Sequence, residues 1–525
     1  MHPTAEEVVV VGGGPVGLWL AAELRLGGAS VTLLETREER NPHSKALTLH
    51  PRTLEILAFR GAAEPFLAEG RPIPNGHFGS LDDRMDFGAL DTPFPYTLAL
   101  PQARTEELLE ARARSAGVRI RRGHRVTGLV QKADAVTVTV EGPGGEAYPI
   151  RARYAVGCDG TRSTVREAAG IGFPGTDATV WGWLADVSLD SPPPGPGLSV
   201  SNSEGGVMAL RLPGGLYRFV GVTREDMGAR PAAAPTLTEL RAKIARVAGD
   251  DFGMRDPVWL SRFGNATRQA ARYRAGRVLL AGDAAHTHFP AGGVGLNVGL
   301  QDATNLGWKL AAVVRGTAPE SLLDSYHDER HPVGAELLES TRAQTALMTA
   351  FTAEGQALRA FLGRLIATNP AFSRDLAERL SGLSVAYPPA HGTAAHGTAA
   401  RGTAARGTAA RGTAGPGAAA AVDVHPLAGW RAPDLAFAGR DSDGHGEGAE
   451  TSLFTLLYAG RHVLLDLTGE AGDALAAPSG PSSGLPVPAG RTVVHRAPLA
   501  RPHPGWSGVR SALVRPDGHV AWATG

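Results

Sequence analysis

The residues with the clearest chemistry form a glycine-rich turn near the start of the chain. Residues 12–17 read GGGPVG and fit the pattern G-x-G-x-x-G, between an apolar β-branched run at 8–11 and a helical stretch at 18–26. Such a turn presents backbone N–H groups and the positive end of a helix to a pyrophosphate. The dinucleotide contacts predicted here are those of Gly12, Gly14, Pro15 and Gly17.

An acidic residue follows at the position that would meet a ribose. Glu35 ends the next strand-like run, residues 30–35. Its carboxylate can accept hydrogen bonds from both ribose hydroxyls. An acid rather than an arginine at this position favours FAD or NAD over NADP.

A second segment places an aspartate at the end of another buried strand. Residues 277–286 read RVLLAGDAAH, so Asp283 is expected at the carboxyl edge of an α/β sheet, where it can accept hydrogen bonds from ribityl hydroxyls. The glycine-rich residues 290–297 follow and lead into a helix expected at 297–314. Backbone N–H groups there can reach a flavin ring, and the helix dipole would stabilise its anionic reduced form.

A third segment, residues 158–166, reads CDGTRSTVR. In this order and at these separations, the three segments resemble those of the class A flavoprotein monooxygenases, typified by p-hydroxybenzoate and phenol hydroxylases. Within that class the chain is most similar to the aromatic-polyketide hydroxylases and the rifampicin monooxygenases. Residues 44–55, SKALTLHPRTLE, and 301–309, QDATNLGWK, support the resemblance, as does the C-terminal stretch 513–518, LVRPDG.

The resemblance implies FAD as the cofactor, NADPH or NADH as a transient co-substrate, and O2 as the oxygen source. A C4a-hydroperoxyflavin would hydroxylate an aromatic, polycyclic polyketide-type substrate. Because the cofactor carries this chemistry, no catalytic side chain is assigned. Further cofactor-binding residues implied by the resemblance are Lys45, Gln102, Val126, Asp159, Asp283, Pro290, Gly293, Gly295, Leu296 and Asn297. Two alternatives stay open: Baeyer–Villiger oxygenation of a polycyclic ketone, and flavin-dependent reduction of a lipid-like substrate.

The predicted fold class is α/β. A Rossmann-type FAD-binding domain would carry a β-rich substrate domain as an insertion, then a helical segment and a C-terminal thioredoxin-like α/β domain. At 525 residues the chain is long enough for several domains. The expected parts are 1–178 and 270–385 for the FAD-binding domain and the helical segment, 179–269 for the substrate domain with a contribution from 76–97, 386–422 for a flexible Gly/Thr/Ala repeat linker, and 423–525 for the C-terminal domain.

Composition limits the partners. The chain has 52 Lys and Arg against 52 Asp and Glu, which argues against nucleic acid or an anionic membrane. Its single cysteine, Cys158, excludes an intramolecular disulfide and dithiol chemistry in the C-terminal domain. His286 and His288 have no third ligand at a suitable spacing, so no metal site is predicted. The expected protein is cytoplasmic, a monomer or homodimer.

The substrate is expected between the β-rich segment and the flavin. Apolar side chains that could line its pocket are Trp181, Trp183, Met208, Tyr217 and Phe219. Tryptophans at such positions are more often part of a core, so Trp181 and Trp183 could either pack in the core or line the substrate pocket.

Residues 391–415 repeat a five-residue unit of the type HGTAA or RGTAA, a composition typical of a flexible linker. Replacing 391–415 by a short Gly/Ser bridge should therefore leave FAD binding intact. The FAD content of the purified deletion variant, measured from flavin absorbance, checks this. Loss of FAD would show that the repeats belong to an ordered domain.

Overall fold

The computed structural model describes residues 6–195, 197–229, 231, 233–388, 425–438, 450–468 and 491–525. The chain forms two compact units, Met1–Val385 with Tyr458–Gly460, and Ala386–Leu457 with Arg461–Gly525. The repeats at 391–415 lie outside the described residues. Among the described helices, none combines the length and apolarity that crossing a lipid bilayer requires.

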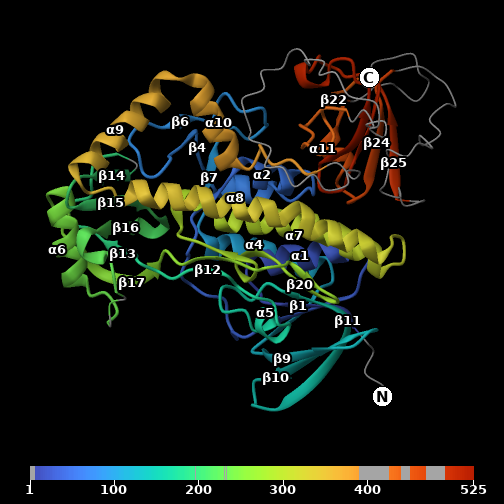
Figure 1. Ribbon diagram of the computed structural model, residues 1–525, viewed down its shortest axis with the longest axis horizontal. Coiled ribbons are helices and arrows are strands. Elements are labelled where there is room, and N and C mark those ends of the chain that lie inside the picture. The colour runs from blue at the N-terminus through green and yellow to red at the C-terminus, as the bar shows by residue number, and fades with distance from the viewer. Residues whose placement is uncertain are drawn as a thin grey trace, which may run out of the picture. The chain divides into compact units, whose positions relative to one another are not determined.

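A parallel sheet forms the centre of the first unit. Its strands follow the order β19-β20-β11-β1-β2-β8, and all neighbouring pairs from β20 to β8 are parallel. Strands β9 and β10 extend β11 as an antiparallel meander (Figure 1). The bounds are β1 Glu6–Val11, β2 Val31–Glu35, β8 Arg119–Arg122, β9 Arg125–Gln131, β10 Val136–Glu141, β11 Ala147–Gly157, β19 Arg274–Ala275 and β20 Val278–Leu280.

Two helices pack closely against each other beside this sheet. Helix α1, Pro15–Leu26, contacts the 20-residue helix α7, Gly295–Val314, and the Trp19 indole donates a hydrogen bond of 2.8 Å to the Thr304 hydroxyl. The longer helix α8, Asp324–Met348, lies alongside α7 (Figure 1). Helix α4, Gln102–Ser115, contacts α1, and the short α5, Thr164–Ala168, follows β11.

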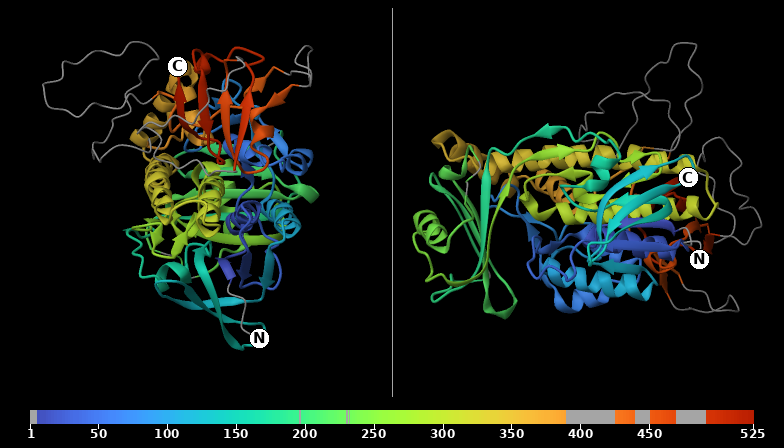
Figure 2. Two further views of the ribbon diagram at one scale, coloured as in Figure 1. Left: turned by 90° about the vertical axis from the view of Figure 1, so that its right-hand side faces the viewer. Right: turned by 90° about the horizontal axis from the view of Figure 1, so that it is seen from below.

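The segment after β11 forms a separate antiparallel sheet in the order β14-β15-β16-β13-β17. Its strands are β13 Trp181–Ser188, β14 Gly197–Ser201, β15 Gly205–Arg211, β16 Tyr217–Thr223 and β17 Arg255–Gly264. Helix α6, Leu237–Ala248, packs on one face of this sheet (Figure 2). The sequence pattern predicted strands here and missed α6, although Thr236 caps its start and Gly249 ends it.

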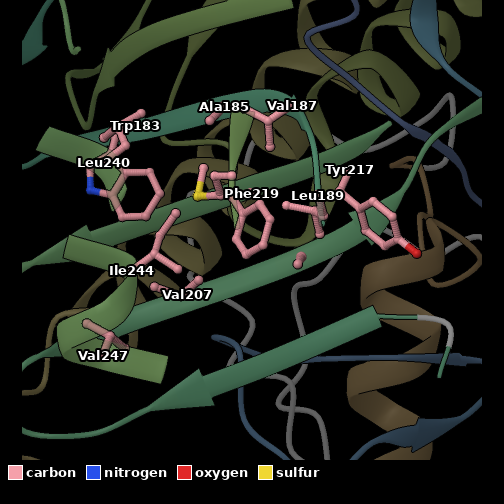
Figure 3. Packing of buried hydrophobic residues seen from close by; sticks show 12 residues of the cluster. Trp183, Ala185, Val187, Leu189, Val207, Tyr217, Phe219, Leu240, Ile244 and Val247 are labelled. Atoms are coloured by element: carbon pink, nitrogen blue, oxygen red, sulfur yellow. The ribbon is translucent and has the colours of Figure 1, made fainter. Parts of the chain in front are cut away.

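The core of this sheet lies between the strands and α6. Trp183 and Phe219 are fully buried there and point towards Leu240 and Ile244 of the helix (Figure 3). Tyr217 belongs to the same cluster. Successive residues of a strand face opposite sides, so the neighbouring Val220 and Val222 face away from α6.

The remaining elements of the first unit connect these layers. Leu81, Met85 and Phe87 pack against the ends of α8 to α10. The connecting elements are α2 Pro51–Ala58, α3 Glu64–Glu69, α9 Ala353–Thr368, α10 Pro370–Ser381, β3 Thr48–Leu49, β4 Arg71–Ile73, β5 Asn75–Gly76, β6 Met85–Asp86, β7 Thr97–Ala99, β12 Gly175–Thr176, β18 Thr267–Gln269 and β21 His286–Thr287.

The second unit holds a sheet of order β25-β24-β26-β27, in which β24 and β25 are parallel and the other pairs antiparallel. Val463, Leu465 and Val514 are fully buried in it. Its elements are β22 Ala436–Phe437, β23 Thr451–Ser452, α11 Leu453–Leu456, β24 His462–Asp466, β25 Thr492–Arg496, β26 Ser511–Val514 and β27 Val520–Thr524.

The burial of Trp183 gives a test of this packing. Trp183→Ala should lower the free energy of unfolding by about 3–5 kcal/mol, because it leaves a large cavity under α6. Trp181→Ala is the matched control, since the Trp181 side chain is partly exposed, and it should cost clearly less. Urea unfolding followed by circular dichroism measures both. Equal losses would contradict the assignment of Trp183 to this core.

Candidate cofactor and substrate site

The three predicted segments meet at one edge of the parallel sheet. Residues 12–14 follow β1, residues 158–160 follow β11, and the turn Gly282–Ala284 follows β20. Because these strands are parallel neighbours, their carboxyl ends lie side by side. Ligands bind at this edge in open α/β sheets.

The glycine turn is as crowded as the sequence pattern predicts. A Cβ on Gly12 would lie 2.3 Å from the carbonyl oxygen of Cys158, and one on Gly17 would lie 2.0 Å from the carbonyl oxygen of Gly12. Gly12 also has φ +107°, a conformation that favours glycine. Both positions therefore require glycine for backbone packing alone.

Gly14 differs from these two glycines. A Cβ there would meet no protein atom within 4 Å. Gly14 is also the N-cap of α1, where no side chain caps the helix and Pro15 occupies the first turn. The first N–H groups of α1 thus face an open space with positive potential, the arrangement that binds phosphates.

Glu35 lies beside this turn, at the end of β2. Its carboxylate accepts hydrogen bonds from the N–H of Gly13 at 2.6 Å and of Arg37 at 2.9 Å. The backbone N–H of His124 donates to the Glu35 carbonyl at 3.0 Å, which brings the start of β9 next to this strand end. Val126 is two residues further along β9, and its side chain is buried.

Asp159 holds the turn after β11. One carboxylate oxygen accepts from the Ser163 hydroxyl at 2.5 Å and the other from the Val165 N–H at 3.1 Å, at the start of α5. Burial raises the pKa of Asp159. Arg166 bridges this turn to the next strand end by donating to the carbonyl of Ala284 at 3.0 Å.

Asp283 is exposed at the carboxyl end of β20, and a buried charge network lies beneath its turn. Asp302 accepts hydrogen bonds from the Gly282 N–H at 3.2 Å and from Arg330 at 2.7 Å, and lies 2.7 Å from the His286 ring. Burial would raise the pKa of Asp302, but Arg330 and His286 bring it below its ordinary value. His286 thus has a structural role. In the described part of the chain, no group of His, Cys, Asp and Glu residues could hold a metal ion.

The loop before α7 is held by Asn297. Its side-chain oxygen accepts from the His50 N–H at 2.8 Å, and its amide donates to the carbonyls of Thr48 at 3.2 Å and Gly293 at 2.9 Å. A Cβ on Gly293 would lie 2.7 Å from the Thr48 hydroxyl. Asn297 therefore positions this loop with its side chain.

The beginning of α7, like that of α1, has no side-chain cap. The first N–H groups of the helix therefore remain available. Gly295 and Leu296 form this first turn, where a Cβ on Gly295 would lie 3.1 Å from the His288 ring. Pro290 is exposed at the other end of the loop.

Lys45 and Gln102 lie on two segments that are bound to each other. Gln102 accepts a hydrogen bond from the Ala46 N–H through its side chain and donates its own backbone N–H to the Ala46 carbonyl, both at 2.9 Å. Its side-chain amide donates to Glu106 at 2.7 Å. Lys45 is exposed on this segment.

These residues fit FAD. The open N-termini of α1 and α7 can receive a pyrophosphate and a reduced flavin, Glu35 and Asp283 can accept from sugar and ribityl hydroxyls, and the space above Gly14 is what a pyrophosphate needs.

A pocket lies next to the loop before α7. Its cavity volume is about 50 Å³, and the pocket is partly open to the outside. Its walls come from β14 to β17, from the loop at Phe289 and from the helical segment. The lining residues are Ser80, Val200, Ser201, Gly206, Val207, Met208, Val220, Gly221, Val222, Phe263, Phe289, Pro290, Met348 and Arg359.

The pocket corrects the predicted apolar lining. Met208 does line it. Trp183, Tyr217 and Phe219 instead belong to the core under α6, on the opposite face of the same sheet. The Trp181 indole donates to the carbonyl of Gly228 at 3.3 Å, and Trp181 is not among the pocket residues.

Several residues that shape the site were missed. Thr48, His50 and Asp302 all lie in segments already used for the family resemblance, 44–55 and 301–309, so a signal existed. Phe263 and Met348 carried no signal beyond being apolar.

Comparisons with known proteins agree with this site. Residues 5–341 match the family described as FAD binding domain, and residues 425–525 match the family described as aromatic-ring hydroxylase, C-terminal. The chain is 46% identical over 517 residues to an uncharacterized aromatic compound monooxygenase, YhjG, of Bacillus subtilis, covering 98% of this chain and 94% of the relative. It is 40% identical over 527 residues to a rifampicin monooxygenase of Streptomyces venezuelae, covering 98% and 95%.

A solved structure shows the same likeness. The anhydrotetracycline hydroxylase OxyS of Streptomyces rimosus has a TM-score of 0.83 and 40% identity, with 99% of this chain and 96% of that chain covered. The chain therefore belongs to the FAD-dependent aromatic-ring monooxygenases. The predictions of a mixed α/β fold and of FAD are confirmed, and use of NADPH or NADH is typical of the family.

The open space at Gly14 yields a sharp test of the cofactor site. Gly14→Val should fold normally, since its side chain meets no protein atom, yet lose FAD, because the valine would occupy the space of the pyrophosphate. Gly128→Val is the control, since Gly128 in β9 also has no atom within 4 Å of a Cβ. Flavin absorbance and circular dichroism are the measurements. A yellow Gly14→Val protein would contradict this cofactor site.

Proposed function

We propose that this enzyme hydroxylates an aromatic, polycyclic polyketide-type substrate with NADPH or NADH as reductant and O2 as the oxygen source. The observation that carries the proposal is the apolar pocket that meets Phe289 and Pro290, at the start of the loop before α7. The rifampicin and anhydrotetracycline enzymes to which the chain is similar are named for large ring systems.

The apolar lining of the pocket favours an uncharged ring. Val220, Phe263 and Met348 provide carbon surfaces from three elements, and burying an aromatic ring against such surfaces is favourable. Arg359 is the one residue of the lining that carries a charge, and its guanidinium donates to three backbone carbonyls. The lining therefore gives little reason to prefer a charged substrate.

In this proposal the protein positions the substrate, and the cofactor carries out the reaction. When bound, FAD would supply the reducing electrons for O2 and the transfer of one oxygen atom to the ring. The chain would hold the ring beside Pro290 and keep water away from the reacting atoms with its apolar lining. The lining offers no carboxylate or histidine as a base, so ring activation would rest on the acidity of the substrate's own phenol.

We also propose the domain division predicted from the sequence, with 423–525 as a thioredoxin-like domain. The mixed sheet of β24 to β27 supports it. Because the one cysteine, Cys158, lies elsewhere, this domain would act as a scaffold rather than in dithiol exchange.

The reaction is tested with purified enzyme, NADPH and isotopically labelled 18O2 across a panel of phenolic polycycles, tetracycline-type rings and ansamycins. We expect substrate-stimulated NADPH oxidation and a product with one 18O atom on an aromatic carbon, read by mass spectrometry and NMR. An ester or lactone containing 18O would instead indicate Baeyer–Villiger oxygenation. A saturated product without 18O would indicate a reductase.

A further inference from the structure

A left-handed turn forms part of the pocket wall. Gly79 has φ 56° and Ser80 has φ 55°. Ser80 lines the pocket and is buried. A residue with a Cβ rarely adopts this conformation, and it persists only where the surrounding structure holds it in place.

Three side chains bind the backbone polar groups of this turn. The N–H of Gly79 donates to Gln344 and the N–H of Ser80 to the His77 ring, both at 3.3 Å. Arg359 donates to the carbonyls of Gly79 at 3.0 Å and Ser80 at 2.7 Å. Gln344 and Arg359 are distant from this turn in the sequence, whereas His77 is three residues before Ser80.

The protonation state of His77 suits this role. Burial, with the charge of Arg84 nearby, lowers the pKa of His77 to about 4. The ring is therefore neutral near pH 7, and its Nδ1 can accept the hydrogen bond from Ser80. Gln344 and Arg359 are also buried, so water does not compete for their hydrogen bonds.

The hydroxyl of Ser80 makes a weak bond in the structure. It donates to the sulfur of Met208 at 3.2 Å, and a thioether is a poor acceptor. The other lining residues with polar side chains are Ser201 and Arg359. The Arg359 guanidinium already donates hydrogen bonds to backbone carbonyls. A carbonyl or hydroxyl on a bound ring would be a stronger partner for Ser80 than the Met208 sulfur.

The turn also lies close to the loop before α7. A Cβ on Gly292 would lie 3.2 Å from the Gln344 side-chain oxygen, the same atom that accepts from Gly79. The buried Gln344 side chain therefore binds the Ser80 turn and lies next to this loop.

We propose that Ser80 is the specificity-determining residue of the pocket. Its hydroxyl hydrogen-bonds a hydroxyl or carbonyl on the edge of the aromatic substrate, and Arg359 and Gln344 are positioning residues. This proposal rests on the proposed function, because it takes the pocket to be the substrate site. The strained turn would serve to aim one hydroxyl into an otherwise apolar space.

The test measures binding rather than turnover. The oxidised holoenzyme is titrated with 1-naphthol and with naphthalene, and the change in flavin absorbance gives the dissociation constants. Ser80→Ala should weaken 1-naphthol binding roughly 3- to 10-fold, the usual effect of one neutral hydrogen bond, and leave naphthalene binding unchanged. FAD content should not change in the variant.

Two further variants separate the hydroxyl from the turn. Ser80→Gly removes the hydroxyl and relieves the strain, so it should weaken 1-naphthol binding as much as Ser80→Ala. Arg359→Lys cannot hold both carbonyls in the same way, and it should weaken 1-naphthol binding selectively with FAD retained.

Other results would overturn the proposal. Equal weakening of both probes would indicate that Ser80 only packs, and no weakening, or no binding of 1-naphthol to the unmodified enzyme, would remove Ser80 from substrate recognition. The proposed function is tested separately. If 1-naphthol binding depends on Ser80 but no substrate incorporates 18O, this inference holds and the proposed oxygenation is refuted.

Discussion

The parallel contact between α1 and α7 is the constraint on which the site depends. Glycines make it possible. A Cβ on Gly299 would lie 2.6 Å from Val16, one on Gly307 would lie 2.6 Å from Glu23, and one on Gly27 would lie 2.2 Å from Ala311. The contacts advance in the same direction along both helices, so the two N-termini lie at the same end. Both uncapped ends thereby face the carboxyl edge of the sheet.

The positive N-terminal ends of α1 and α7 can stabilise a ligand that carries negative charge at two positions. FAD carries negative charge at its pyrophosphate, and its flavin ring acquires a further negative charge when it is reduced. Neither helix neutralises its own end with an acidic side chain in the first turn. The acids of the site instead occupy strand ends: Glu35 is the last residue of β2, and Asp159 and Asp283 follow β11 and β20. There they can meet hydroxyl groups or fix turns without cancelling the helix potential.

The sequence pattern placed the three glycine-rich or acidic segments at strand ends, because the constraints on these segments are local. Gly12 and Gly17 must be glycine for contacts within a short stretch, and such stretches have a recognisable spacing. The pocket was harder to predict. On β16, Phe219 and Val220 are both apolar neighbours, and only the position of α6 decides which of them faces a core and which faces a cavity. The missed helix α6 and the placing of Tyr217 and Phe219 in the pocket lining are therefore one error.

Ser80 illustrates the kind of residue that sequence patterns do not reveal. A serine after a glycine is typical of an ordinary exposed turn, and its partners Gln344 and Arg359 lie far along the chain. Ser80 is distinguished by two features: buried groups bind its backbone, and its hydroxyl donates a weak hydrogen bond to the Met208 sulfur. By contrast, the side chains of Arg359 in the pocket wall and of Asn297 in the loop before α7 bind backbone carbonyls. The protein uses its polar groups to hold positions, which leaves the reaction itself to the cofactor.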